Sequence, residues 1–118
     1  MKEHLYHYRA EVTSVYDGDT CTLTIDLGLH LKIEDEKVRL SRINAPEVRG
    51  EERPEGLVAR DWLRERIEGR QVWIQTIKDK KGKYGRYIAE IWVEDEPEVF
   101  VNISDEMVAA GLAEYKEY

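Results

Sequence analysis

The chain has 118 residues, of which 42% are hydrophobic and 36% are charged, and its formal net charge is −7. These values are typical of one globular domain with a modest core. No segment approaches the ~20 apolar residues of a membrane span, so we expect no membrane partner. The first residues contain no apolar signal-peptide region, although a processed form would look the same. The single cysteine, Cys21, cannot form an internal disulfide and slightly favours the cytoplasm, and the compartment stays open.

Charge is distributed unevenly along the chain. Residues 90–118 contain nine acids and one base, whereas residues 1–89 contain 16 acids and 17 bases. Within the latter part, residues 78–86 (KDKKGKYGR) contain five bases and one acid. Because local potential steers a charged ligand more than total charge does, the negative net charge does not exclude nucleic acid as a partner.

Two strands joined by a tight turn are predicted near the amino terminus. Residues 9–16 are strand-like, and residues 20–27 alternate apolar and polar side chains, with Thr20 on the polar face. The Asp-Gly pair at residues 17–18 is a strong hairpin signal, in which glycine supplies a positive φ. We therefore expect Asp19 at the first position of the second strand.

Two helices are also predicted. Residues 53–69 carry Pro54 where a first turn would begin and Gly69 where the helix would end. A shorter helix is expected within residues 104–111, with Ser104 as its N-cap. The longer helix has an apolar face with four-residue spacing, formed by Ala59, Leu63 and Ile67 beside Trp62.

The remaining segments complete a mainly β, or α+β, pattern. Residues 30–43 predict a further strand pair around an acidic turn at residues 34–37, and residues 71–77 and 86–93 predict two more strands joined by a basic loop. Three strands, a helix, two strands and a short helix are the arrangement of a five-stranded OB-fold Greek-key barrel. We expect residues 1–118 to form this single domain; a small α+β sheet domain is the alternative.

Three segments together contain the groups that phosphodiester hydrolysis needs. Side-chain oxygens of Asp19 and Asn44 and the main-chain carbonyl of Ala45 can bind a hard cation. Arg39 and Arg86 can hold a phosphate through paired hydrogen bonds and stabilise its transition-state charge. Glu47 is the candidate group that orients or deprotonates the attacking water.

These segments resemble the staphylococcal nuclease-like, or thermonuclease, family. The motifs DGDT, VRL with NAPE, DKKGKYGR and AAGLA stand in the family's order and at similar spacing between about Leu5 and Tyr115. The resemblance implies an OB-fold enzyme that hydrolyses DNA and RNA with calcium and little sequence preference, leaving 3′-phosphate ends. By position it implies the following roles: Asp19, Asn44 and the Ala45 carbonyl as calcium ligands, Arg39 and Arg86 as phosphate-binding residues, Glu47 as the water-activating residue, Lys83 and Tyr84 as contacts to a terminal phosphate, and Tyr115 as a residue that stacks on a base.

The chain departs from the family pattern in three places. Asn44 replaces an aspartate ligand, the loop after Glu47 is shorter, and the family's third helix is missing from this sequence. The loss of a carboxylate predicts weaker or altered cation binding. Besides a monomeric nuclease, two other functions stay open: a non-catalytic OB-fold module that binds nucleic acid, and a protein-interaction domain that uses the acidic residues 90–118.

Overall fold

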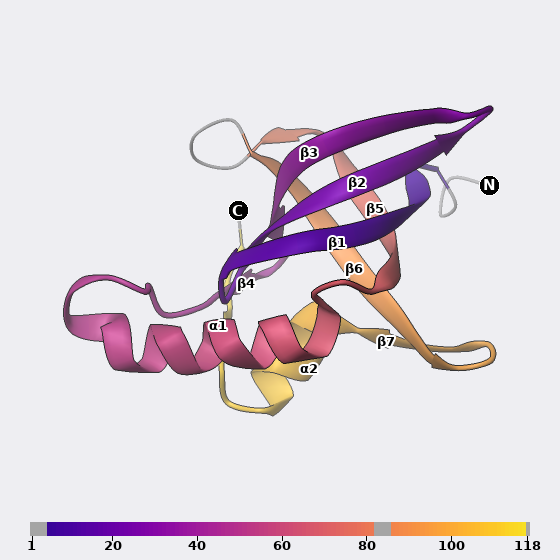
Figure 1. The fold of residues 1–118 in the computed structure, drawn as a ribbon. Helices are drawn as coiled ribbons and strands as arrows, with labels where there is room; N and C mark the ends of the chain where they lie inside the picture. Colours follow the sequence, from indigo (N-terminus) through magenta and orange to yellow (C-terminus); the bar gives the residue numbers. More distant parts are fainter. Residues whose placement is uncertain (1–4, 82–85, 118) are drawn as a thin grey trace.

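A closed β-barrel with two helices at one end makes up the computed structural model, which describes residues 5–81 and 86–117 (Figure 1). Its elements are, in chain order, β1 (His7–Asp17), β2 (Thr20–Gly28), β3 (Leu31–Leu40), β4 (Ile43–Asn44), the 3-10 helix η2 (Gly50–Glu52), α1 (Arg53–Ile67), β5 (Gln71–Lys81), β6 (Tyr87–Glu96), β7 (Val99–Asn102), α2 (Ile103–Ala109) and β8 (Glu114–Tyr115).

The barrel closes through a pairing between strands that are distant in sequence. Among the described residues the sheet order is β3-β2-β1-β5-β6-β7, and β3 also pairs with β6. That pairing is parallel and joins Val38, Arg39 and Leu40 to residues 87–89, while the neighbouring pairs β1–β2, β2–β3, β1–β5 and β5–β6 are antiparallel. Five strands thus form the barrel and β7 extends it beyond β6, which confirms the predicted OB-fold architecture.

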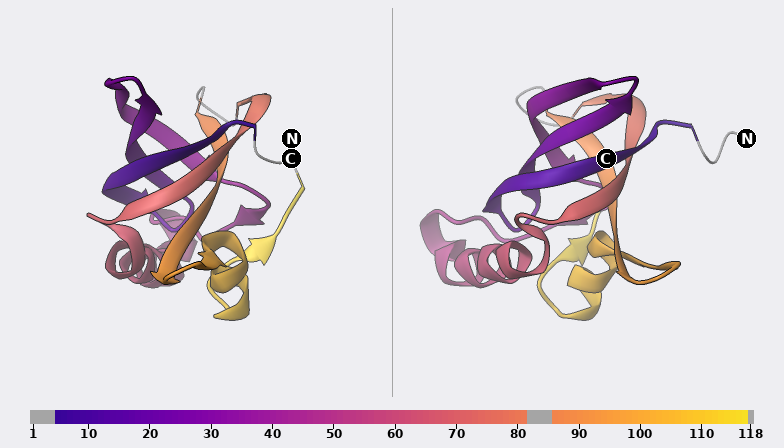
Figure 2. Two further views of the ribbon diagram at one scale, coloured as in Figure 1. Left: turned by 90° about the vertical axis from the view of Figure 1, so that its right-hand side faces the viewer. Right: turned by 45° about the vertical axis from the view of Figure 1, so that its right-hand side comes forward.

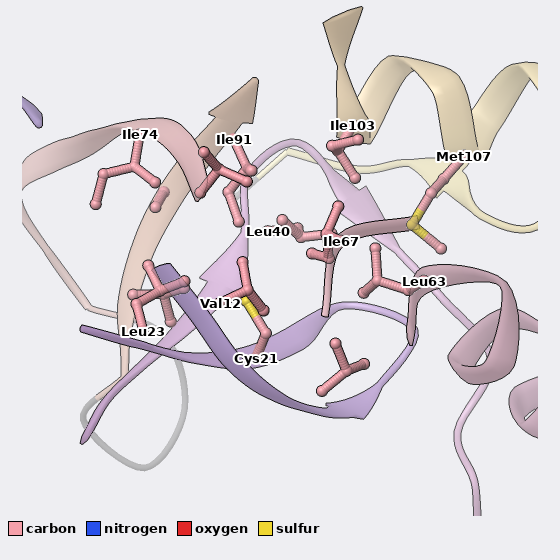
Figure 3. Packing of buried hydrophobic residues seen from close by; sticks show 14 of the residues in the cluster. Val12, Cys21, Leu23, Leu40, Leu63, Ile67, Ile74, Ile91, Ile103 and Met107 are labelled. Atoms are coloured by element: carbon pink, nitrogen blue, oxygen red, sulfur yellow. The ribbon is translucent and has the colours of Figure 1, made fainter. Parts of the chain in front are cut away.

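Helix α1 covers one end of the barrel, as the ribbon views show (Figure 2). Pro54 lies at its first turn, and Gly69 adopts a φ of 80° just beyond its end, as the pattern predicted. The predicted apolar face is buried, and Figure 3 shows Leu63 and Ile67 packed toward Val12, Leu40 and Met107. Among the described residues, no helix is long and apolar enough to cross a bilayer.

The acidic turn predicted at residues 34–37 is wrong, because β3 is one continuous strand. β2 pairs with β3 on both sides of this segment, at Ile25 with Ile33 and at Leu23 with Glu36. β3 uses one residue more than β2 between these pairs, and Asp35 has a φ of 57°. The turn-forming residues therefore form a β-bulge, which bends a strand without ending it.

Three further expectations were incomplete or wrong. The cap of α2 is Asn102, whose side chain accepts a hydrogen bond from the Asp105 N–H, and Ser104 is instead buried inside the first turn. β5 continues to Lys81, so it includes half of the predicted basic loop. The short strands β4, β7 and β8 were not predicted, because two- to four-residue strands are too short for a periodic pattern.

Candidate active site

The DGDT turn is shaped by close packing. Gly18 and Asp19 are the two turn residues, so the prediction that Asp19 begins the second strand is wrong by one position. Gly18 is not among the glycines with positive φ, which also corrects its expected conformational role. A Cβ at Gly18 would lie 2.8 Å from the Ala45 Cβ and 2.9 Å from the Ala59 Cβ. Glycine is therefore needed here so that the turn can fit between the end of β4 and α1.

The side chain of Asp19 is buried, with an exposed fraction of 6%, and it contacts several of the other candidate site residues. Its Oδ2 accepts hydrogen bonds from the Ala45 N–H at 3.0 Å and from Arg39 Nη2 at 3.2 Å. Its Oδ1 accepts one from the Thr20 hydroxyl at 3.3 Å. The main-chain carbonyl of Asp19 also accepts from the Leu40 N–H at 2.8 Å, so side chain and backbone are both fixed against the end of β3.

The Arg39 guanidinium donates hydrogen bonds to both of the side chains predicted to bind the cation. Its Nη2 donates to Asn44 Oδ1 at 3.0 Å as well as to Asp19, and its Nη1 donates to the Ile43 carbonyl at 3.1 Å. A carboxylate oxygen and an amide oxygen thus lie within hydrogen-bond distance of one cationic nitrogen. Hard oxygen donors around one point fit Ca²⁺ in kind. No group of three or more His, Cys, Asp or Glu side chains suited to a metal occurs within residues 5–81 and 86–117, so Asn44 and main-chain carbonyls would have to complete the ligand set.

Arg86 is linked to Asp19 through Thr20, a residue that was not predicted to be part of the site. Arg86 Nη1 donates to the Thr20 hydroxyl at 2.8 Å, and Thr20 in turn donates to Asp19. Thr20 is buried, with an exposed fraction of 3%, although the alternation placed it on the polar face. Its position beside Asp19, at the end of the DGDT motif, could have indicated that it belongs to the site. The two predicted phosphate-binding arginines are therefore both linked to Asp19, Arg39 directly at Oδ2 and Arg86 through Thr20 at Oδ1.

Glu47 lies on an exposed loop two residues beyond Ala45. In the part of the chain that the structure describes, its carboxylate makes no hydrogen bond or ion pair. Its main-chain carbonyl, however, packs so closely on α1 that a Cβ added at Gly56 would lie 2.0 Å from it. A glycine inside a helical pattern is a signal of such an approach, so Gly56 could have been singled out. The helix therefore fixes the loop that carries Glu47.

The predicted nucleotide contacts are placed only in part. Lys83 and Tyr84 lie outside the described residues. Tyr115 lies in β8, where it pairs with Ile43, and its side chain lines a cavity of about 760 Å³ beside β4. This cavity also borders Ser41 and Ile88. The structure thus brings Tyr115 next to the strand that carries Asn44.

A second carboxylate, Asp17, lies directly beside Asp19. Its Oδ1 accepts a hydrogen bond from the Asp19 N–H at 3.0 Å. Burial, and then the charge of Asp19, raise the pKa of Asp17 to about 6. The interpretation of Asp17 as a turn residue alone is therefore incomplete, because it adds titratable negative potential next to the predicted cation ligands.

Comparison with known proteins agrees with this geometry. The family model described as Staphylococcal nuclease homologue matches residues 37–118. The chain is also 30% identical over 110 residues to a thermonuclease of Staphylococcus intermedius. That alignment covers 91% of this chain and 59% of the relative, so the chain spans somewhat more than half of that protein's length. The match over most of the chain, together with the closed OB barrel, shows that this protein belongs to the staphylococcal nuclease family.

Proposed function

We propose that this protein is a calcium-dependent nuclease that hydrolyses DNA and RNA with little sequence preference. The observation that carries the proposal is the convergence of Asp19, Arg39 and Asn44 around one point, with Arg86 joined to it through Thr20. Family membership supports the same reaction class. We propose that the protein acts as a monomer.

The chain's own residues divide the work of the reaction. Glu47 orients the attacking water and takes its proton, while Arg39 and Arg86 donate hydrogen bonds to the phosphoryl oxygens, whose negative charge grows in the transition state. The water oxygen bonds to phosphorus, the bond to the 5′ oxygen breaks, and that oxygen takes a proton from solvent, which leaves a 3′-phosphate and a 5′-hydroxyl.

The cation would be held by Asp19, Asn44 and the Ala45 carbonyl. When bound, it supplies positive charge that polarises the phosphate and acidifies water. Arg39 donates hydrogen bonds to the Asp19 and Asn44 oxygens and neutralises the charge of Asp19. Lys83, Tyr84 and Tyr115 are proposed to hold the nucleotide next to the scissile bond.

The test compares plasmid DNA, single-stranded DNA and RNA with calcium and with a chelator, and identifies the product ends by labelling. Glu47→Gln and Arg86→Ala should each lower kcat by at least about a hundredfold without unfolding the protein, because each removes a group acting mainly in the transition state. Glu51→Gln, at an exposed glutamate in η2, and Arg60→Ala, at a partly exposed arginine of α1, are matched controls that should keep full activity. Unchanged turnover in both site variants would show that the site is assigned wrongly.

A binding-only module is the second candidate function, and one observation favours it. Asp19 is the only carboxylate among the proposed cation ligands, and it is already paired with Arg39. Such a module would bind single-stranded DNA tightly with and without chelator and would leave it intact. Metal-dependent cleavage by the wild-type protein would eliminate this candidate.

A further inference from the structure

A second cluster of charges, centred on Arg42, lies beside the candidate site. Arg42 Nε and Nη2 donate to the two carboxylate oxygens of Glu90 at 2.6 and 3.0 Å, and Nη1 donates to Asp105 Oδ1 at 2.9 Å. The Tyr115 hydroxyl donates to the same Asp105 oxygen at 2.8 Å. The guanidinium carbon of Arg42 lies 5.9 Å from the centre of the Tyr115 ring. One arginine thus ties β6, α2 and β8 to the bend before β4.

The backbone of Arg42 is strained in a way that these contacts maintain. Its φ is 67°, in the left-handed region that glycine adopts without cost. Its carbonyl accepts a hydrogen bond from the Lys116 N–H at 2.8 Å, and the next residue, Ile43, pairs with Tyr115. Strained conformations persist where surrounding contacts hold them and concentrate at functional sites. Arg42 therefore holds β8 through both its main chain and its side chain.

The cluster forms part of the wall of the cavity beside β4. Arg42, Glu90 and Tyr115 line its volume of about 760 Å³ together with the apolar side chains of Ile77 and Ile88. This volume is in the range of small-molecule sites. β4 connects this cavity to the residues around Asp19, because Ile43 pairs with Tyr115 and its carbonyl accepts a hydrogen bond from Arg39. Movement of Arg42 would thus displace the aromatic wall relative to the phosphate-binding groups.

We propose that Arg42 is a positioning residue that fixes Tyr115 and β8 against β4, so that the cavity is preformed for the nucleotide next to the scissile phosphate. The inference rests on the proposed function, since the substrate is a nucleic acid. A preformed wall lowers the ordering cost of binding. The Arg42 cluster therefore acts on substrate binding, and hence on KM, more than on the chemical step.

Arg66 provides a matched control within the same molecule. It donates to both carboxylate oxygens of Asp95, at 2.9 and 2.6 Å, and to Glu106 at 2.6 Å. It therefore also bridges two carboxylates and ties α2 to β6, but from α1 and without lining the cavity. Replacing Arg66 therefore removes a similar set of ion pairs but leaves the contacts that hold Tyr115 and β8 in place.

The experiment measures kcat and KM on a single-stranded oligonucleotide with calcium, the Kd of thymidine 3′,5′-bisphosphate with calcium by calorimetry, and urea unfolding. Arg42→Met should raise KM and this Kd about tenfold, as expected when side chains that were fixed must be ordered on binding, and should leave kcat nearly unchanged. Arg42→Lys should be intermediate, because an ammonium group cannot bridge two carboxylates as a planar guanidinium does. Arg66→Met should change neither KM nor Kd.

Asp105→Asn is the second variant, chosen because this side chain is half-exposed and the substitution keeps its size while removing its charge. It should raise KM in the same direction as Arg42→Met. If Arg42→Met and Asp105→Asn change KM no more than Arg66→Met does, the cluster is only structural and the inference is wrong. A fall in kcat at constant KM would also overturn it. A wild-type protein that neither cleaves nor binds nucleic acid would refute the proposed function, and the inference with it.

Discussion

The contact between α1 and the loop that carries Glu47 predicts that Gly56→Ala destabilises the protein, although helix propensity alone predicts that it stabilises it. Gly56 lies in the first turns of α1, where replacement by alanine would by propensity alone stabilise the helix by about 1 kcal/mol. A Cβ at this position would, however, lie 2.0 Å from the Glu47 carbonyl oxygen and 2.9 Å from the Val48 nitrogen. These are backbone atoms that cannot rotate away, so the helix or the loop must move.

The expected size of the effect follows from these two opposing contributions. Overpacking costs about 1–3 kcal/mol, and the propensity gain offsets about 1 kcal/mol of it. Gly56→Ala should therefore lower the free energy of unfolding by up to about 2 kcal/mol, measured by urea denaturation. Because the displaced loop carries Glu47, kcat should also fall, by roughly ten- to a hundredfold for a shift near 1 Å.

Val58→Ala is the control, since Val58 lies on the exposed side of the same helix. It should be neutral or stabilise by a few tenths of a kcal/mol through propensity, roughly as host–guest scales indicate. If Gly56→Ala raised stability as much as Val58→Ala and kept full activity, the close packing of α1 on this loop would be wrong.

Three further substitutions or labels test other parts of the structure. Asp17→Asn should stabilise the metal-free protein at pH 7 by roughly 1–2 kcal/mol. The pKa of Asp17 is raised from 3.8 to about 6, so the wild-type protein loses stability as pH rises through this window, and the advantage of the variant should disappear near pH 4. Asn102→Ala should cost about 1 kcal/mol in urea unfolding through loss of the α2 cap; no loss would show that the cap is unimportant. Burial raises the pKa of the Cys21 thiol to about 12, so a thiol reagent should label Cys21 only at the rate of unfolding, and rapid labelling of the native protein would contradict its burial.

The elements that could be predicted from sequence are those whose signals are local. The helix over residues 53–67 has its proline, its four-residue apolar spacing and its terminal glycine within one segment. The strand over residues 20–28 is identified by alternation alone. These signals depend on backbone geometry over a few residues, so a single sequence is sufficient to detect them.

The candidate site residues were also found in sequence, as motifs, but their relations were not. The DGDT motif places Thr20 beside Asp19, but the sequence did not indicate that Arg86 would donate to Thr20, or that Arg39 would bind both Asp19 and Asn44. The hydrogen bond from Arg39 to Asp19 joins residues 20 positions apart, and the one from Arg86 to Thr20 joins residues 66 positions apart. Only the pairing of β3 with β2 and β6 brings them together.

The sequence by itself determined the local elements, the barrel class and the set of chemical groups on which the proposed phosphodiester hydrolysis depends. The tertiary structure decided the rest: the bulge at Asp35 in place of a turn, the steric need for Gly18 and Gly56, and the bridging role of Arg42. The physical reason is that pairing partners, close approaches and shared guanidinium groups depend on distances between residues remote in the chain. Such distances are set when the whole core packs, and not by the preferences of any one segment.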